Sequence, residues 1–433
     1  MLDQPNDAYR ILTAGDVPAY LAGLPGLADL LGGGPEDWSC RDVADGNLNA
    51  VFLVDGPAGG LCVKQALPYV RVAGESWPMD INRAFFEVSY ARRIGAFVSR
   101  LAPTIHHFDQ TQFVIVMAKL APHIILRRAM IVGEHYPRVA TDVAEYVAAA
   151  SFFTSDLANP FETKAADQAL FSGNVALQRI SVDLIFTDPY TVAERNRVTA
   201  PLEGWAAAFR ADIDLKEAVA RARLAYLTHA QSLLHGDLHS GSIMVTPEET
   251  RVIDGEFAWV GPSGFDIGNF IAHYVMAWYA TPFHGAASGE TAHFRGLLAA
   301  DILTFWQHFE TRFLAHWRGF MGAADGLPNR HFGTPVAAAR AETLRRAYVA
   351  DLFRDAVMFM ACKIIRRVLG FAQIADFLAI EDEQARAGAQ AGALAFARSA
   401  LLHPGRYRDI ASVVAALPRF EGAGPDPDRT RAF

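Results

Sequence analysis

The first part of the chain, from about residue 38 to 120, has the hydrophobic pattern of β-strands. Two short apolar runs, Val51–Val54 and Leu61–Lys64, flank the turn-prone stretch Asp55–Gly60, and this arrangement predicts a β-hairpin with a long loop. Phe113–Met117 is a further run that contains β-branched residues, which predicts another strand. The pattern therefore indicates a small β-sheet in this region.

Helical patterns begin inside this region and dominate after it. From Arg83 to Ile94 apolar residues recur at helical spacing, and Gly95 predicts the end of that helix. After Leu120 three long stretches with helical periodicity follow, at residues 136–153, 215–234 and 341–369. A β-rich part followed by a larger helical part predicts an α+β fold of two lobes, joined near residues 116–122.

The length of 433 residues agrees with two lobes, because it exceeds what one compact core usually holds. We expect an N-lobe at residues 1–118, a C-lobe at 119–421 and a frayed tail, rich in Pro, Asp and Arg, at 422–433. The most apolar stretch, Phe265–Phe283, is interrupted by polar residues such as Asp266. It predicts a buried helix rather than a membrane span.

Composition narrows the classes of partner. Hydrophobic residues make up 52% of the chain and charged residues 20%, so a large core can form. The net charge of −8 and the absence of a basic run argue against nucleic acid or anionic membranes as partners. The three cysteines are widely scattered, which argues against a zinc cluster or disulfide framework. The N-terminal residues lack a signal-peptide pattern, so we expect a cytoplasmic protein.

The clearest chemical signal lies just after the middle of the chain. Two apolar strands at residues 243–245 and 252–253 flank a short polar turn. Asp237 precedes the first strand, and Asp254 and Glu256 follow the second, so these acids can point into one cleft. Kinase-type phosphoryl transfer needs such a layout, because one carboxylate accepts the proton of the acceptor hydroxyl while others hold Mg²⁺.

Asp254 and Glu256 are two residues apart, and alternate residues share a face on an extended segment. Both carboxylates could therefore reach one Mg²⁺, which prefers hard oxygen ligands. An isolated Asp-x-Glu or His-Gly-Asp usually marks only a solvated turn. The two motifs together, in this order and on either side of a β-pair, favour the catalytic interpretation.

The stretch from His235 to Val245 resembles the catalytic loop of the aminoglycoside-phosphotransferase and choline-kinase-like superfamily, which has the protein-kinase-like fold. Most members place Asn five residues after the catalytic Asp, whereas this chain has Ser242 there. Ser242 together with Asp254-Gly255-Glu256 resembles the 5-methylthioribose kinase family in particular. The resemblance implies that Asp237 is catalytic and binds the acceptor, and that Asp254 and Glu256 bind Mg²⁺ with Ser242 as a helper.

A phosphate-binding loop is indicated at Asp45–Phe52. It contains a single glycine, so by itself it would be interpreted as a β-turn. Gly46 and Asn47 tolerate positive φ, and the side chains of Asn47 and Asn49 can donate to phosphate oxygens. The segment resembles the loop of the same kinase family, which implies nucleotide binding by these three residues.

Lys64 and Glu87 are the candidate partners for the nucleotide phosphates. A lone Lys in an edge strand is normally solvated, but in a kinase N-lobe it would hold the α- and β-phosphates and pair with Glu87 on the next helix. The adenine is expected at the main chain of Met117 to Leu120. Relatives often carry an acidic residue at this junction, where this chain has Ala118-Lys119.

Arg366 and Arg367 lie near the end of a long helix that Gly370 is expected to close. Adjacent helical residues point about 100° apart, so they could be two unrelated surface arginines. Their surroundings resemble the family's twin-arginine segment, which implies that they hold sugar hydroxyls beside Asp237. Asp266 matches a superfamily residue that braces the catalytic loop, and His235 and His239 are expected to be structural.

The resemblance as a whole implies an ATP- and Mg²⁺-dependent kinase that phosphorylates the 1-hydroxyl of 5-methylthioribose in methionine salvage, as a homodimer. One alternative is a related kinase for another small alcohol, such as a pentose, choline or an aminoglycoside. The arginines argue against a cationic acceptor. The other alternative is an inactive nucleotide-binding scaffold, and the presence of Lys64, Asp237, Asp254 and Glu256 together argues against it.

Overall fold

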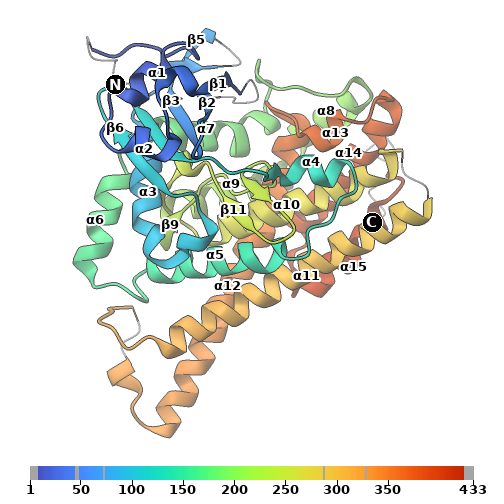
Figure 1. Cartoon of the computed structure of the whole chain (residues 1–433). Helices are drawn as coiled ribbons and strands as arrows, with labels where there is room; N and C mark the ends of the chain where they lie inside the picture. The colour runs from blue at the N-terminus through green and yellow to red at the C-terminus, as the bar shows by residue number, and fades with distance from the viewer. Residues whose placement is uncertain (1–7, 44–47, 72–73, 286–287, 327–328, 424–433) are drawn as a thin grey trace.

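A five-stranded antiparallel sheet with flanking helices precedes a larger, mostly helical part of the chain (Figure 1). The computed structural model describes residues 8–43, 48–71, 74–285, 288–326 and 329–423. The predicted α+β fold class, with a β-rich N-lobe and a helical C-lobe, is confirmed. The predicted phosphate-loop residues Gly46 and Asn47 lie outside the described residues, as does the tail from residue 424 onward.

The N-lobe sheet contains the predicted hairpin. Its strands, in the order β1-β2-β3-β7-β6, are β1 (Ser39–Asp42), β2 (Asn49–Asp55), β3 (Gly60–Ala66), β7 (Val114–Ala118) and β6 (Ile105–Asp109). Phe52 and Val54 of β2 and Val63 of β3 are buried against helices α1 (Val17–Ala22) and α2 (Leu27–Leu31). Since β3 lies in the middle of the sheet, Lys64 is not in an edge strand and is not the solvated residue that an edge would carry.

Helix α3 (Arg83–Val98) packs below this sheet and is longer than predicted. Gly95 does not end it, because the apolar spacing continues from Ile94 to Val98, and both residues are buried. Between β3 and α3, the small hairpin of β4 (Tyr69–Val70) and β5 (Gly74–Pro78) carries Trp77. The Trp77 ring lies 5.2 Å from that of Phe371 in the C-lobe.

The C-lobe is built mainly from helices. They are α4 (Leu126–Ile131), α5 (Val139–Phe153), α6 (Phe161–Phe171), α7 (Val175–Phe186), α8 (Glu203–Ala211), α9 (Ile213–Thr228), α10 (Gly264–Ala280), α11 (Ser288–Gly319), α12 (Pro335–Leu369), α13 (Ala375–Leu378), α14 (Glu383–Leu402) and α15 (Ile410–Ala416). The predictions for 136–153 and 341–369 correspond to α5 and α12. The long helices α11 and α14 had not been predicted.

Short strands lie between these helices and carry the loops of the candidate site. They are β8 (Ile124–Ile125), β9 (Ser232–Leu234), β10 (Ile243–Val245), β11 (Thr250–Val252) and β12 (Trp259–Gly261). The prediction of one helix over 215–234 is wrong at its end, because α9 stops at Thr228 and residues 232–234 pair with β12. The Leu233 N–H also donates to the Thr154 hydroxyl, which a helix would not permit.

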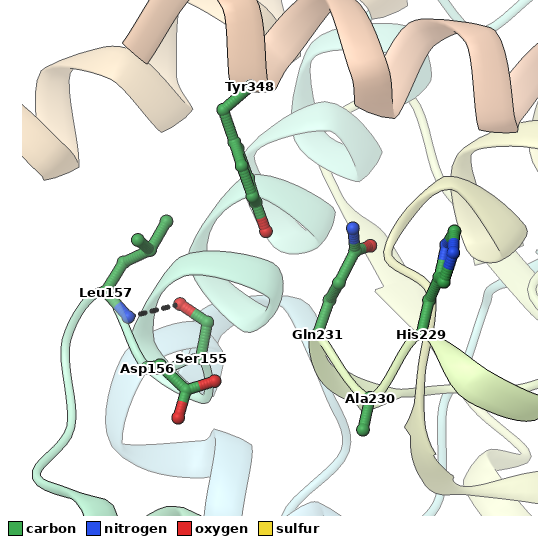
Figure 2. A pocket seen from close by; sticks show the side chains of 7 residues that line it. All are labelled: Ser155, Asp156, Leu157, His229, Ala230, Gln231 and Tyr348. Atoms are coloured by element: carbon green, nitrogen blue, oxygen red, sulfur yellow. Dashed lines mark hydrogen bonds between the residues drawn. The ribbon is translucent and has the colours of Figure 1, made fainter. Parts of the chain in front are cut away.

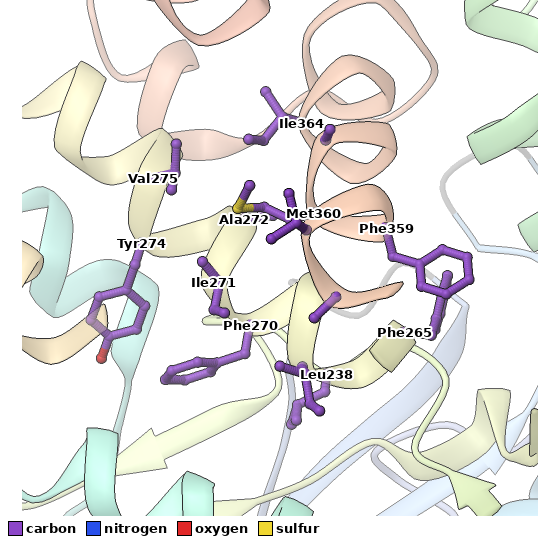
Figure 3. Close-up of a cluster of buried hydrophobic side chains, with 14 of the residues drawn as sticks. Leu238, Phe265, Phe270, Ile271, Ala272, Tyr274, Val275, Phe359, Met360 and Ile364 are labelled. Atoms are coloured by element: carbon purple, nitrogen blue, oxygen red, sulfur yellow. The ribbon is translucent and has the colours of Figure 1, made fainter. Parts of the chain in front are cut away.

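The C-lobe core is centred on α10, whose residues are all buried, as predicted for the apolar stretch. Figure 3 shows side chains of α10, including Phe265 and Phe270, packed with Phe359 and Met360 of α12. Glycine at position 268 allows the two helices to approach closely, since a Cβ there would lie only 2.7 Å from the Met360 nitrogen. Within the described ranges, no helix has the length and apolar character that crossing a bilayer requires.

Candidate active site

The β10–β11 hairpin brings the two acidic motifs together. Ile243 pairs with Val252 in the antiparallel register, and the Ile253 N–H donates to the Ser242 carbonyl at 2.9 Å. Gly236 has φ 82°, and a Cβ there would overlap the Phe257 carbonyl. The loop before β10 therefore lies directly against the turn after β11, and it needs glycine at this contact.

Asp266, in the first turn of α10, binds the backbone of the loop that carries Asp237. Its Oδ2 accepts from the His235 N–H at 2.7 Å, and its Oδ1 accepts from the Gly236 N–H at 3.0 Å. His235 in turn donates from Nε2 to the Ile253 carbonyl at 2.8 Å. The structure thus places Asp266 and His235 where they can fix the backbone just before Asp237.

Asp237 is held by two side chains. Lys363 Nζ lies 2.6 Å from its Oδ1, and His239 Nε2 lies 3.2 Å from its Oδ2. Burial favours the neutral acid, but the Lys363 charge and the His239 contact outweigh it and hold the pKa of Asp237 well below its usual range. Asp237 is therefore a carboxylate with fixed orientation.

His239 contacts the predicted catalytic residue, beyond the structural role that the sequence suggested. Its Nδ1 accepts from the N–H groups of Gly241 and Ser242 at 3.0 and 3.1 Å, so Nε2 carries the proton and donates to Asp237. Burial lowers the pKa of His239 to about 3, which keeps the ring neutral. Ser242, the predicted metal helper, accepts from the His239 N–H at 2.9 Å and lies within hydrogen-bond reach of the Asp237 and His239 carbonyls.

Lys64 joins the N-lobe to the second acidic motif. Its Nζ lies 2.8 Å from Glu87 Oε2, as predicted, and it also forms an ion pair with Asp254 Oδ1. Lys64 and Glu87 are buried, whereas the Asp254 side chain is 50% exposed. Burial disfavours the ammonium, but Asp254 and Glu87 outweigh it and raise the pKa of Lys64 well above its usual range. A fixed positive charge thus faces an acid that solvent can reach.

The segment from Asp254 to Glu256 differs from the prediction that it is extended. Asp254 has φ 71° and ψ 43°, in the left-handed region, and Gly255–Phe257 form a 3₁₀ helix. Gly255 packs so closely on Tyr90 of α3 that a Cβ would overlap the ring. The shape of the turn therefore depends on its contact with the N-lobe helix, and the residues of the turn alone do not predict that contact.

Glu256 faces the N-lobe strand β2. Its Oε2 accepts from Asn49 Nδ2 at 2.8 Å and lies 3.5 Å from Nε of Arg83. The side chain is buried. In the part of the chain that the structure describes, no three His, Cys, Asp or Glu side chains cluster as a metal site would. A pair such as Asp254 and Glu256 is nevertheless a suitable donor set for Mg²⁺, which takes its other ligands from water and phosphates.

A group of arginines lies beside Asp237. Arg366 and Arg367 both point to the Ala372 carbonyl, with Nη1–O distances of 3.4 and 3.0 Å. Burial lowers the pKa of each, and Asp237 opposes the shift in both cases. The alternative of two unrelated surface arginines is wrong, because Arg367 is buried and Arg366 partly buried.

Arg127 and Asp376 complete this group and were missed by the sequence analysis. Arg127 Nη2 lies 3.3 Å from His239 Nδ1, and its Nε lies 3.9 Å from Asp376 Oδ2. Asp376 is 1% exposed, and neither of its carboxylate oxygens has a hydrogen-bond partner among the described residues. A buried carboxylate without donors is unfavourable, so this oxygen pair is available to a ligand.

The predicted adenine site lies where β7 ends and the chain enters the C-lobe. Met117 is opposite Cys62 of β3 and Ile105 of β6, and Leu120 follows two residues after the strand. The N–H of Lys119 donates to the Gly60 carbonyl at 3.3 Å, and its ammonium pairs with Asp55. The junction is therefore tied back to the β2–β3 hairpin.

A separate cavity of about 320 Å³ lies elsewhere in the C-lobe (Figure 2). Tyr348 of α12 reaches towards the loop at residues 155–157, and Gln231 and His229 line the other side. None of the predicted site residues lines it. The chemistry of Asp237, Lys64 and Asp254 thus belongs to the lobe junction and not to this cavity.

Comparison with known proteins agrees with this arrangement. Residues 39–297 match the model of the phosphotransferase enzyme family. Methylthioribose kinase 2 of Oryza sativa subsp. japonica is 36% identical over 422 residues, which cover 97% of this chain and 98% of that protein. Methylthioribose kinase of Escherichia coli O45:K1 is 36% identical over 416 residues, 96% of this chain and 99% of that protein.

Among solved structures, choline kinase from Cryptosporidium parvum Iowa II covers 94% of this chain and 99% of its own, with a TM-score of 0.46 and 11% identity. The match to the plant and bacterial proteins extends over nearly the full length on both sides. The chain belongs to the methylthioribose kinase family of phosphotransferases.

Proposed function

We propose that the protein transfers the γ-phosphoryl group of ATP to the 1-hydroxyl of 5-methylthioribose, as a step of methionine salvage. The observation that carries the proposal is the position of Asp237: it is an oriented carboxylate on the loop that packs against the turn after β11, where Asp254 pairs with Lys64. The relatives named methylthioribose kinase support the choice of acceptor.

In the proposed reaction the N-lobe and the junction hold the nucleotide. The boundary at 118/119 separates the lobes, and the backbone from Met117 to Leu120 binds the adenine. Gly46 and Asn47 would bind the phosphates, whereas the buried amide of Asn49, predicted for the same role, bonds to Glu256 and Arg83. Lys64 binds the α- and β-phosphates while Glu87 keeps its ammonium in place.

Asp254 and Glu256 would hold Mg²⁺, which supplies positive charge that neutralises the phosphates when it is bound. Both carboxylates are paired with N-lobe donors, Lys64 for Asp254 and Asn49 for Glu256. These contacts involve one oxygen of each carboxylate, Oδ1 of Asp254 and Oε2 of Glu256. Ser242 contributes by bonding within the loop that presents Asp237.

The acceptor lies on the arginine side of Asp237. The hydroxyl donates its proton towards Asp237 while its oxygen attacks the γ-phosphorus, and the bond to the ADP oxygen breaks. Arg366 and Arg367 donate to the sugar hydroxyls and offset the charge that develops on the phosphoryl oxygens. Asp376, whose two carboxylate oxygens have no hydrogen bond from the described residues, accepts hydrogen bonds from further hydroxyls of the sugar.

The acceptor is tested by incubating the protein with ATP, Mg²⁺ and, in separate reactions, 5-methylthioribose, ribose, choline and kanamycin. Phosphorus NMR should show a new sugar 1-phosphate only with 5-methylthioribose. Faster transfer to choline or kanamycin would contradict the assignment. Sedimentation of the purified protein tests the proposed homodimer, and fractionation of cells tests the cytoplasmic location.

The role of Asp237 is tested with Asp237→Asn, which keeps the shape of the side chain. Turnover should fall by roughly 10²–10⁴-fold, the usual contribution of a general base. The affinity for ATP, measured by calorimetry, should stay within a few-fold. Wild-type turnover in this variant would refute the role.

A further inference from the structure

Lys363 is the direct partner of the proposed catalytic carboxylate. Its Nζ lies 2.6 Å from Asp237 Oδ1, and its side chain is 2% exposed. Within the described part of the chain, Asp237 provides the one hydrogen bond that Lys363 makes. Burying a lysine ammonium is unfavourable unless an acid pairs with it. The ion pair with Asp237 is therefore the contact that stabilises Lys363 in its buried position.

The fold positions Lys363 through helix α12. The helix packs against α10 at Gly264 and Gly268, where the backbones approach too closely for a Cβ. On α12, Arg366 and Arg367 come three and four residues after Lys363, so both lie next to it on the helix surface. The Lys363 ammonium thus enters the site from a long, rigid helix.

Lys363 and His239 divide the carboxylate between them. Lys363 binds Oδ1, and the neutral His239 ring donates from Nε2 to Oδ2. A carboxylate has about four acceptor positions, so two donors leave room for the acceptor hydroxyl. With both oxygens held from different segments, the Asp237 side chain has little freedom to rotate.

We propose that Lys363 is a positioning residue for phosphoryl transfer: its ammonium holds Oδ1 of Asp237 and so aims a free lone pair of this carboxylate at the acceptor hydroxyl. The inference rests on the proposed function for the role of Asp237. It assigns to a helix far along the chain a part of the catalytic machinery that the loop motifs do not contain.

The surrounding charges predict how pH reveals this role. Burial lowers the pKa of Lys363 to about 7, opposed by Asp237 and reinforced by Arg367 and Arg366. The Asp237 pKa is held low chiefly by Lys363, with His239 and Arg367 assisting. Without the ammonium, the effect of burial on Asp237 is less opposed and its pKa rises. Activity that needs the carboxylate is then lost at a higher pH as the solution is acidified.

The test compares Lys363→Met and Lys363→Arg with Lys164→Met. Lys164 is also 2% exposed in the C-lobe, but its ammonium bonds to the Gln231 carbonyl and not to the site. Lys164→Met therefore reproduces the loss of a buried lysine without touching Asp237. The measurements are kcat, KM for ATP, KM for the acceptor and the pH profile of kcat/KM.

Lys363→Met should lower kcat by about 10²-fold or more, the scale of a misplaced base, with KM for ATP little changed. The acid limb of its pH profile should move to higher pH by about one unit, a shift that follows from the lost charge partner. Lys363→Arg, which keeps the charge, should restore the wild-type acid limb and part of kcat. Lys164→Met should keep kcat and the acid limb of the wild type.

An unchanged acid limb in Lys363→Met would overturn the proposal, and so would an equal loss of kcat in Lys164→Met. If Lys363→Met fails to fold, Lys363→Gln, which keeps a donor without charge, must show the same shift. If the wild type uses another acceptor of the panel, the proposed substrate fails and the Lys363 test runs on that acceptor. If the wild type transfers phosphate to none of the four acceptors, both the proposed function and the proposed role of Lys363 are overturned.

Discussion

Arg83 is the buried hub on which the phosphate side of the site depends, and its replacement by Met is the sharpest test of this structure. The guanidinium is 1% exposed. It donates to Asn49 Oδ1 at 3.1 Å and to three backbone carbonyls at 2.7–2.8 Å, those of Asp80, Leu48 and Leu67. It also lies 3.5 Å from Glu256. One side chain thus ties α3, β2 and the segment after β3 to the acidic turn.

The magnitude follows from what Met leaves behind. Met fills the space of the aliphatic stem, so the loss is mainly polar. Three orphaned carbonyls cost about 1 kcal/mol each at the low end of the usual range. Glu256 keeps its hydrogen bond from Asn49 when the Arg83 charge is removed. We therefore assign about 1 kcal/mol to this lost ion pair, well below the roughly 3–5 kcal/mol of a fully broken buried pair. The expected loss is about 4 kcal/mol.

Urea unfolding measures this loss. With a slope of about 3 kcal/mol/M, the midpoint of Arg83→Met should fall by about 1.3 M. Arg93→Met on the same helix is the control, because Arg93 is 22% exposed and pairs with Asp167 at 3.0 Å. Its loss should be about 1 kcal/mol or less. ATP affinity should fall in Arg83→Met and persist in Arg93→Met.

Equal midpoints for the two variants would refute the reasoning, since they would mean that the five contacts of Arg83 add nothing beyond those of the more exposed Arg93. Arg83→Lys gives a second measurement if Arg83→Met does not fold. Lys keeps the charge near Glu256 but has no planar fork for the carbonyls. It should therefore fall between the wild type and Arg83→Met in both stability and ATP affinity.

Two further predictions concern helix α12. Arg366→Ala should weaken the affinity for the sugar more than that for ATP, because Arg366 lies beside Asp237 and not beside Lys64; calorimetry with an unchanged sugar affinity would contradict it. Gly268→Ala should destabilise by about 1–3 kcal/mol, since its Cβ would meet the α12 backbone. Gly296→Ala, at an exposed helical position with no atom near the added Cβ, should instead stabilise slightly, and thermal melts of the two variants measure both changes.

The sequence predicted those features that depend on segments close together along the chain. The β2–β3 hairpin follows from two apolar runs and a turn, and the Lys64–Glu87 pair follows from a strand and the helix after it. The order of Asp237, β10, β11 and Asp254 predicts the convergence of the acids for the same reason. These features need only local spacing and the register of adjacent segments.

What the sequence did not reveal depends on distant partners. Lys363 lies 126 residues from Asp237, and Arg127 lies 112 residues from His239. Before folding, nothing distinguishes these residues from other cations on helices. The left-handed Asp254 was also missed, because the turn is set by Tyr90 of α3 against Gly255. One usable signal was the spacing of Lys363 from Arg366 and Arg367, which groups three cations on α12.

The charges of the site are arranged so that each acid is compensated by a cation from another part of the chain. Lys64 of the N-lobe meets Asp254, Arg83 meets Glu256, and Lys363 of α12 meets Asp237. Since an unpaired buried charge is far costlier than a paired one, the packing of both lobes and α12 is what supplies each acid with its cation. The contacts that stabilise the lobe junction are therefore the same ones that ready the acids for metal, phosphate and hydroxyl. A substitution such as Arg83→Met must then lose stability and nucleotide binding together.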